Sequence, residues 1–196
     1  MRAMLEHAAA ARKGKKQIDP RAEMGSVAEN QSGDCFMPIQ TGDKLPDATF
    51  MTPTVDGPAP KTTADIFAGK TVAFFAVPGA FTPTCSAKHL PSFRDAAEKL
   101  SAKGVDSIAC LSVNDVFVMG EWGKSTDSDG KIQMLADGNG AFTKALGLEL
   151  DASGFGMGTR SQRYSMLVED GKVTQLNVED GGAYEVSSAE YMLGQM

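Results

Sequence analysis

A continuous, largely apolar run at residues 71–77 (TVAFFAV) limits what this chain can fold into more than any other feature. The run is rich in β-forming residues and lies between two turn-forming pairs, Gly69-Lys70 and Pro78-Gly79. Apolar side chains at consecutive positions fit a strand that is covered on both faces, because a half-exposed strand would alternate polar and apolar residues. The sequence therefore predicts a central, fully buried strand at 71–77.

Strands and helices alternate along the chain from residue 44 onward. Further strands are expected at 105–113, 132–136, 163–169 and 172–178, and the last two flank Asp170-Gly171, a strong hairpin signal. Helices are expected at 85–102, 115–122 and 140–146, followed by a last helix that Ser187 or Ser188 caps and that runs through Leu193. This order predicts an α/β fold with a central mixed β-sheet flanked by helices, and it is compatible with a thioredoxin-like core.

The first 36 residues differ from the rest of the chain. They are polar, carry both signs of charge and have no apolar period beyond a short Ala-rich stretch, so we expect a disordered or weakly ordered extension. Residues 37–196 are expected to form the folded domain. Cys35 falls in the extension, where we expect a dispensable thiol. A targeting segment and an overhang from an upstream start codon remain two alternatives for residues 1–36.

Charge and cysteine content exclude several classes of function. The formal net charge is −6 and the isoelectric point is about 4.9, which disfavours nucleic acid and anionic membranes as partners. No apolar run reaches the roughly 20 residues of a membrane-spanning helix. Three scattered cysteines cannot build a disulfide framework, and because none belongs to a CxxC pair and only two histidines could add to them, we expect no structural zinc site. Sparse cysteines fit a reducing compartment, so we expect a cytoplasmic protein without a bound cofactor.

Cys85 is the candidate nucleophile. It follows the predicted central strand, and Pro83 is well suited to be the first helical residue, which makes Thr82 the natural N-cap with its hydroxyl near the Cys85 amide. A thiol in the first helical turn lies among unpaired N–H groups at the positive end of the helix dipole, and both favour the thiolate. A packed, inert cysteine is the plainer interpretation of an arbitrary thiol, but the Thr-Pro-x-x-Cys arrangement after a buried strand favours the nucleophile.

Four other residues have more than one interpretation. His89 lies four residues after Cys85, so a Cys–His hydrolase dyad competes with a pocket-lining or hydrogen-bonded structural histidine, which we favour. Cys110 is either a small buried apolar residue or a resolving thiol for Cys85. Arg160 and Arg163 precede a strand, and a guanidinium there would stabilise a thiolate if it reached the same sheet edge.

The segment at 78–93 (PGAFTPTCSAKHLPSF) closely resembles the active-site segment of peroxiredoxins, specifically the peroxiredoxin-five subfamily, called type II in plants. The similarity runs from about Met37 to the C-terminus and includes 109–115 (ACLSVND) and 160–190. It implies a thioredoxin-like fold and a thiol-dependent peroxidase. By this resemblance Cys85 is the peroxidatic cysteine, Thr82 positions thiolate and peroxide, Pro78 shields the pocket, and Arg163 is the catalytic arginine. Arg160 has no such match.

The resemblance also implies a mechanism and partners. Cys85 would attack hydrogen peroxide or an organic hydroperoxide and become a sulfenic acid, which a second thiol then reduces. Some relatives carry a resolving cysteine near the C-terminus, but the corresponding segment at 183–188 (AYEVSS) has none. We therefore expect recycling by glutathione or glutaredoxin, and a homodimer. A thioredoxin-like reductase is disfavoured because no CxxC pair is present, and a non-enzymatic redox sensor or holdase chaperone is the remaining alternative.

Overall fold

The computed structural model describes residues 37–196. The expectations for residues 1–36, including the extension and Cys35, lie outside the described residues. Within the described part, no helix has the length and apolar character needed to cross a membrane.

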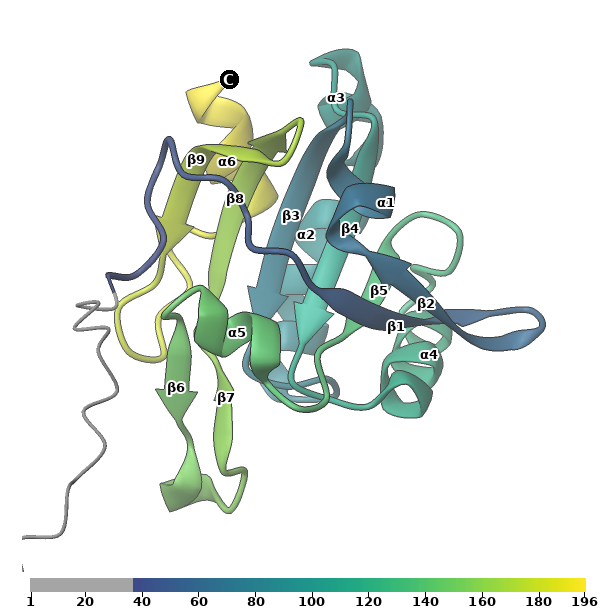
Figure 1. The fold of residues 1–196 in the computed structure, drawn as a ribbon, viewed down its shortest axis with the longest axis vertical. Coiled ribbons are helices and arrows are strands. Elements are labelled where there is room, and N and C mark those ends of the chain that lie inside the picture. The colour runs from purple at the N-terminus through teal and green to yellow at the C-terminus, as the bar shows by residue number, and fades with distance from the viewer. Residues whose placement is uncertain (1–36) are drawn as a thin grey trace, which may run out of the picture. The chain divides into compact units, whose positions relative to one another are not determined.

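A mixed sheet of seven strands organises the fold, in the order β2-β1-β5-β4-β3-β8-β9 (Figure 1). β3 pairs in parallel with β4 and antiparallel with β8, β4 pairs in parallel with β5, and β8 pairs antiparallel with β9. A separate two-stranded sheet joins β6 and β7. The strands are β1 (Thr49–Thr54), β2 (Gly57–Thr62), β3 (Thr71–Val77), β4 (Ser107–Ser112), β5 (Gln133–Ala136), β6 (Glu149–Asp151), β7 (Thr159–Ser161), β8 (Tyr164–Glu169) and β9 (Lys172–Val178).

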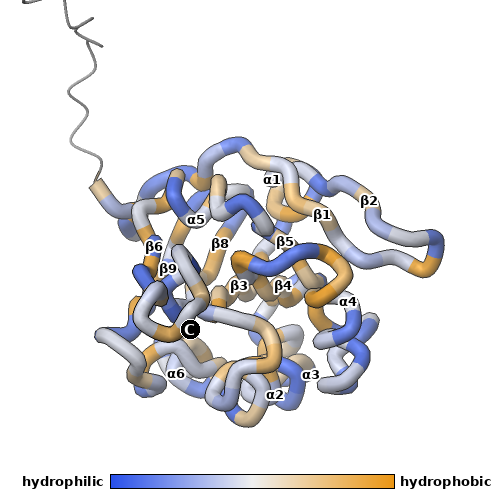
Figure 2. The backbone as a smooth tube through the Cα atoms, turned by 90° about the horizontal axis from the view of Figure 1, so that it is seen from below, coloured by the Kyte–Doolittle hydropathy of each residue, from blue (hydrophilic) through white to orange (hydrophobic). Residues whose placement is uncertain are grey.

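Helices cover both faces of this sheet, as Figure 2 shows from below. They are α1 (Thr63–Phe67), α2 (Leu90–Asp95), α3 (Ala97–Ala102), α4 (Val116–Ser125), α5 (Ala141–Ala145) and α6 (Ala189–Gln195). Phe75 of β3 points into the layer with α2, α3, α4 and α6, and its ring stacks on Phe93 at 4.2 Å. Phe74 points to the opposite layer, with α1 and α5. This alternation confirms that 71–77 is a strand buried on both faces, and the whole confirms the α/β prediction with a mixed sheet.

The two hairpins β1–β2 and β6–β7 were not predicted. β2 (GPAPKT) carries two prolines and alternates only weakly, which is tolerated because it is an edge strand with partners on one side only. β6 and β7 have three residues each, too few for a period to show in the sequence. Elsewhere the predicted elements are present, β3 and β9 with the predicted bounds and the others with shifted ends. Asp115 caps α4, and Ser188, one of the two expected caps, caps α6.

The prediction of one regular helix over 85–102 is wrong. Residues Cys85–His89 form a π-helical turn, α2 follows directly, and Ala96 separates α2 from α3. The wide turn is closed by a bond from the Leu90 amide to the Cys85 carbonyl. Pro91 accounts for it, because proline has no N–H and its ring would clash with the carbonyl of the residue four positions earlier in a regular α-helix.

Candidate active site

Cys85 lies where the central strand passes into the helical segment. β3 ends at Val77, the chain turns through residues 78–82, and helical structure begins at Pro83 as predicted. The Cys85 side chain is fully buried, with 0% of its surface exposed. The thiol therefore lies inside the protein at the start of a helical segment, among the backbone N–H groups of the first turn.

The loop before Cys85 is held by several short contacts. The Ala80 amide donates to the Asn114 side chain at 3.0 Å, which ties this loop to the one that follows β4. Gly79 is closely approached by the side chains of Met157 and Thr82, each of which has a methyl group that would lie 3.1 Å from an added Cβ, so a larger residue would have to displace these side chains. Pro78 is half-buried beside it.

The predicted capping bond of Thr82 is wrong. The Thr82 hydroxyl donates to the Gly79 carbonyl at 2.9 Å and does not receive the Cys85 amide. The hydroxyl thus closes the tight 79–82 loop, because Gly79 lies three residues before it. Its oxygen lone pairs are left for another donor.

Arg163 reaches Cys85 because of strand register. Ala76 of β3 is opposite Tyr164 of β8, so the residue before β8 lies beside the end of β3 and the loop that carries Cys85. Arg163 Nη1 is 3.4 Å from the Cys85 sulfur, and only 7% of the arginine is exposed. A guanidinium held at this distance in a buried setting stabilises a thiolate by charge and by hydrogen bonding. Its Nε is buried without a partner, which leaves one donor for a ligand oxygen.

Arg160 serves another purpose. Its Nε donates to the Met157 carbonyl at 2.8 Å and its Nη1 donates to the Val113 carbonyl at 2.8 Å. It therefore joins the β6–β7 loop to the loop after β4, and its hydrogen bonds go to these carbonyls and not to the thiol.

His89 is buried beside the same guanidinium. Its Nε2 is 2.9 Å from the Ser187 carbonyl and its Nδ1 is 3.3 Å from Arg163 Nη1. Burial, together with the positive charge of Arg163, lowers the pKa of His89 to about 3. The imidazole is therefore neutral near pH 7 and has hydrogen-bond partners on both nitrogens. The sequence did not show that His89 contacts Arg163, because only the fold brings the two together.

Cys110 lies on β4, opposite Phe75 of β3. Both Cys110 and Cys85 are free thiols in the same apolar cluster. Burial, and to a smaller extent the nearby Cys85, raises the pKa of Cys110 well above its usual value. The expectation of a buried, poorly ionised thiol on this strand is confirmed.

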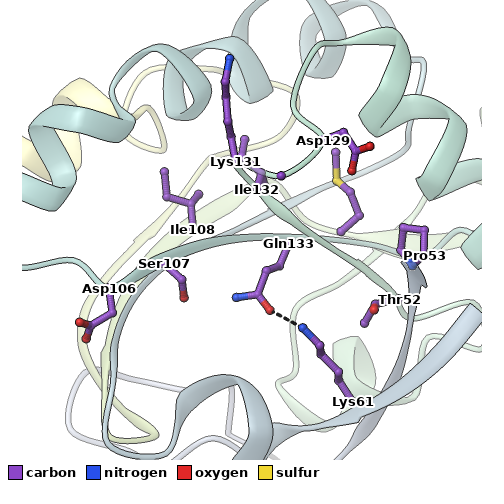
Figure 3. A pocket seen from close by; sticks show the side chains of 12 residues that line it. Thr52, Pro53, Lys61, Asp106, Ser107, Ile108, Asp129, Lys131, Ile132 and Gln133 are labelled. Atoms are coloured by element: carbon purple, nitrogen blue, oxygen red, sulfur yellow. Dashed lines mark hydrogen bonds between the residues drawn. The ribbon is translucent and has the colours of Figure 1, made fainter. Parts of the chain in front are cut away.

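A cavity of about 430 Å³ lies at the other end of β4 (Figure 3). Ser107 and Gln133, from the starts of β4 and β5, line it, and Lys61 donates to the Gln133 side chain across it at 3.0 Å. It contains no thiol. Among residues 37–196, no three His, Cys, Asp or Glu side chains are placed to hold a metal ion. The chemistry of the described residues therefore concentrates at Cys85.

The fold and this site define a class: an α/β protein with a buried thiol placed at the start of a helical segment beside a buried arginine. A family model described as Redoxin matches residues 40–193. The chain is 52% identical over 160 residues to a chloroplastic peroxiredoxin-2E-2 of Oryza sativa, covering 79% of this chain and 71% of that protein. It is 50% identical over 159 residues to peroxiredoxin-2B of Arabidopsis thaliana, covering 80% and 97%.

A solved structure, described as reduced Prx3 in complex with H₂O₂ from Vibrio vulnificus, is similar throughout the folded part. It is 53% identical, has a TM-score of 0.77, and the match covers 80% of this chain and 98% of that one. The chain belongs to the peroxiredoxin family, with the thioredoxin-like fold predicted from the sequence. Its activity class is that of an oxidoreductase that reduces peroxide with a thiol.

Proposed function

We propose that this protein reduces hydrogen peroxide and organic hydroperoxides through a Cys85 sulfenic acid. The observation that carries the proposal is the 3.4 Å contact between the buried Arg163 guanidinium and the buried Cys85 sulfur. In the first step the thiolate attacks the terminal peroxide oxygen, the O–O bond breaks, and the released alkoxide or hydroxide takes a proton to become alcohol or water. Arg163 and the Cys85 amide are the proposed donors to the separating oxygens, and the Thr82 hydroxyl joins them when its hydrogen turns from the Gly79 carbonyl to the peroxide, while Pro78 shapes the pocket.

Glutathione, directly or through glutaredoxin, is the proposed reductant. The sulfenic acid condenses with one thiol to give a mixed disulfide and water, and a second thiol then releases Cys85 as a thiol and leaves with the first as a disulfide. Two features support an external thiol: the segment at 183–188 contains no cysteine, and the pKa of Cys110 is raised by burial. Assignment to the peroxiredoxin-five, or type II, subfamily is proposed from the resemblance of 78–93 and 160–190, and the segment at 183–188 departs from those members that have a resolving cysteine there.

A homodimer is the proposed assembly. Three exposed aromatic residues support it, because large apolar side chains are costly to leave in water: Phe81 is 56% exposed, Phe117 71% and Phe155 86%. Phe81 and Phe155 lie in loops and Phe117 in the first turn of α4, and the Asn114 and Arg160 contacts described above tie both loops to the segment just before α4. Sedimentation of the wild type and of Phe117→Ser tests this. A monomeric wild type would refute it, and dissociation of the variant would place Phe117 in the interface.

The cytoplasm is the proposed location, because Cys85 and Cys110 are free thiols. Two relatives, from Oryza sativa and Arabidopsis thaliana, are described as chloroplastic, so import directed by residues 1–36 is the competing outcome. Fluorescent fusions of the full chain and of residues 37–196 distinguish the two. A full-length fusion confined to an organelle, with a diffuse shorter fusion, would refute the cytoplasmic assignment.

Steady-state peroxide consumption tests the activity. The wild type and Cys85→Ser are compared with hydrogen peroxide and tert-butyl hydroperoxide, with glutathione, glutaredoxin plus glutathione, and thioredoxin supplied in parallel. We expect sustained turnover by the wild type with glutathione or glutaredoxin and none by the variant. A single stoichiometric oxidation without turnover under any reductant would favour the sensor or holdase alternative. Turnover with thioredoxin alone would refute the proposed reductant and leave the peroxidase intact.

A further inference from the structure

His89 has a place in the site that neither a general base nor a packing residue explains. A carbonyl oxygen accepts hydrogen bonds and cannot donate them, so the 2.9 Å contact with the Ser187 carbonyl requires that His89 Nε2 carry the proton. A neutral imidazole protonated at Nε2 has a lone pair at Nδ1. Nδ1 therefore accepts a hydrogen bond from Arg163 Nη1, at 3.3 Å.

The same nitrogen of Arg163 serves both His89 and Cys85. Nη1 carries two hydrogens, and its neighbours are His89 Nδ1 at 3.3 Å and the Cys85 sulfur at 3.4 Å. Because the guanidinium is planar, fixing one of these hydrogens on Nδ1 fixes the direction of the other toward the sulfur. The hydrogen bond to His89 Nδ1 thus fixes the rotation of the guanidinium group about the end of the Arg163 side chain.

A neutral acceptor suits this task better than a carboxylate would. An aspartate or glutamate in this place would bind the guanidinium in a bidentate ion pair and cancel much of its charge. Neutral His89 orients Arg163 and leaves the full positive charge to act on the thiolate. Its low pKa, caused by burial and then by Arg163, keeps it neutral over the pH range in which a thiolate reacts.

The position of Ser187 is itself fixed by a buried carboxylate. Glu179 follows β9, and its Oε1 accepts the amides of Glu185, Val186 and Ser187 at 2.8–2.9 Å and the Ser187 hydroxyl at 2.7 Å. The Glu179 amide also donates to the Arg163 carbonyl at 3.0 Å. One residue thus holds both the backbone of Arg163 and the segment whose carbonyl binds His89.

We propose that His89 is a positioning residue that orients the Arg163 guanidinium toward the Cys85 sulfur. Glu179 holds the Ser187 segment in place, and the Ser187 carbonyl in turn fixes the His89 ring. The proposal rests on the proposed peroxidase function and assigns no proton transfer to His89. Its consequence is that removing the Nδ1 acceptor slows the reaction with peroxide, where Arg163 must bind the sulfur and the oxygens together. It should affect much less a thiolate reaction that needs no oriented donor.

Two variants of His89 differ in whether they have an acceptor near the Nδ1 position. His89→Phe keeps a ring that packs against Phe75 and Phe93 but has no acceptor. His89→Asn places an amide oxygen near the Nδ1 position. Both lose the donor to Ser187, so a difference between them reports the contact with Arg163. If the Phe variant does not fold, His89→Gln replaces it, because its amide lies near the Nε2 position and leaves a methylene near Nδ1.

The measurements are the single-turnover rate with hydrogen peroxide and the rate of alkylation by iodoacetamide across pH. We expect His89→Phe to lower the peroxide rate by about tenfold to about a hundredfold, as for other small misplacements of a reacting group. We expect a much smaller change in the maximal alkylation rate, and recovery of much of the peroxide rate in His89→Asn. In the Arg163→Lys background, His89→Phe should lower the peroxide rate only slightly, because lysine has no planar guanidinium for His89 to orient.

Each result decides the matter. A Phe variant, or a Gln variant in its place, that reacts with peroxide as fast as the wild type would overturn the proposal. So would equal losses in the Phe and Asn variants, or equal losses in the peroxide and alkylation rates, because both indicate a packing role only. Additive effects of His89→Phe and Arg163→Lys would overturn it too. Failure of the proposed function is distinct from these results, because the wild type itself would then show no rapid oxidation by peroxide.

Discussion

Replacing Arg163 by lysine tests the centre of the proposed mechanism. Lysine keeps the positive charge and loses the planar fork, so Nη1 no longer contacts the Cys85 sulfur at 3.4 Å and His89 Nδ1 at 3.3 Å together. The loss is one oriented hydrogen bond to a charged group, about 1.5–3 kcal/mol. At about 1.4 kcal/mol for each factor of ten, the peroxide-dependent step should slow by about tenfold to about a hundredfold.

The same substitution at Arg160 is a matched control. Arg160 donates to the Met157 and Val113 carbonyls, and Arg160→Lys should therefore slow the step much less than Arg163→Lys. Stopped-flow fluorescence is suited to the measurement, because Trp122 is the chain's single tryptophan and its indole N–H donates at 3.0 Å to Ser86, the neighbour of Cys85. If Arg160→Lys slowed oxidation and Arg163→Lys did not, the assignment of the catalytic arginine would be refuted.

The remaining predictions concern the thiols, the loop hydroxyl and acid stability. Cys85→Ser should abolish peroxide consumption while Cys35→Ser leaves it nearly intact, and substantial turnover by the first variant would contradict the mechanism. Thr82→Val should slow peroxide oxidation by roughly tenfold or more in stopped flow, through loss of a donor. Mass spectrometry after treatment with peroxide and glutathione should show a mixed disulfide on Cys85, and Cys110→Ala should retain most turnover. A Cys85–Cys110 disulfide in the oxidised wild type, together with lost turnover in Cys110→Ala, would refute recycling by an external thiol. Burial raises the pKa of Glu179, but the hydrogen bonds that its carboxylate accepts from Ser187 and the neighbouring amides outweigh burial and lower the pKa overall. The Glu179 carboxylate should therefore stabilise the fold fully above the usual glutamate pKa of about 4.3, and this stabilisation should be lost as the pH falls below that value. The free energy of unfolding should decline accordingly in the wild type, and Glu179→Gln should lack this decline.

Local patterns in the sequence predicted the centre of the fold well. The run at 71–77 became β3 with the same bounds, since apolar residues on both faces of a strand need two covering layers. The Asp170-Gly171 turn joins β8 and β9 as predicted, with Asp170 at a positive φ of 47°. These features depend on residues close together in the chain, which is why they could be predicted from sequence.

The errors at Thr82 and over 85–102 arose where one local preference overrode another, whereas the partners of His89 were missed because they are distant in the chain. The sequence placed Thr82 as a cap for Cys85, but its hydroxyl closes the loop onto Gly79. Pro91 widened the first helical turn, although the apolar spacing beyond it indicated a regular helix. His89 was expected to be a pocket-lining or hydrogen-bonded structural histidine, and its ring is hydrogen-bonded, but its partners Arg163 and Ser187 lie 74 and 98 residues away in the chain.

The topology of the sheet explains why such distant residues meet. β3 and β4 are parallel, so both end at the same edge, and there Cys85 follows the one and Asn114 the other. β8 is antiparallel to β3 and must begin at that edge, which places Arg163 beside the thiol. β9 is antiparallel to β8 and therefore ends there, which brings Glu179 to the Arg163 carbonyl. Cys85, Arg163 and Glu179 thus follow or precede strands that end or begin at one edge of the sheet, and His89 lies in the π-helical turn that begins at Cys85. The order and direction of the strands determine which segments meet at this edge of the sheet. The turn before each strand or helix determines which side chain of a segment points into the site.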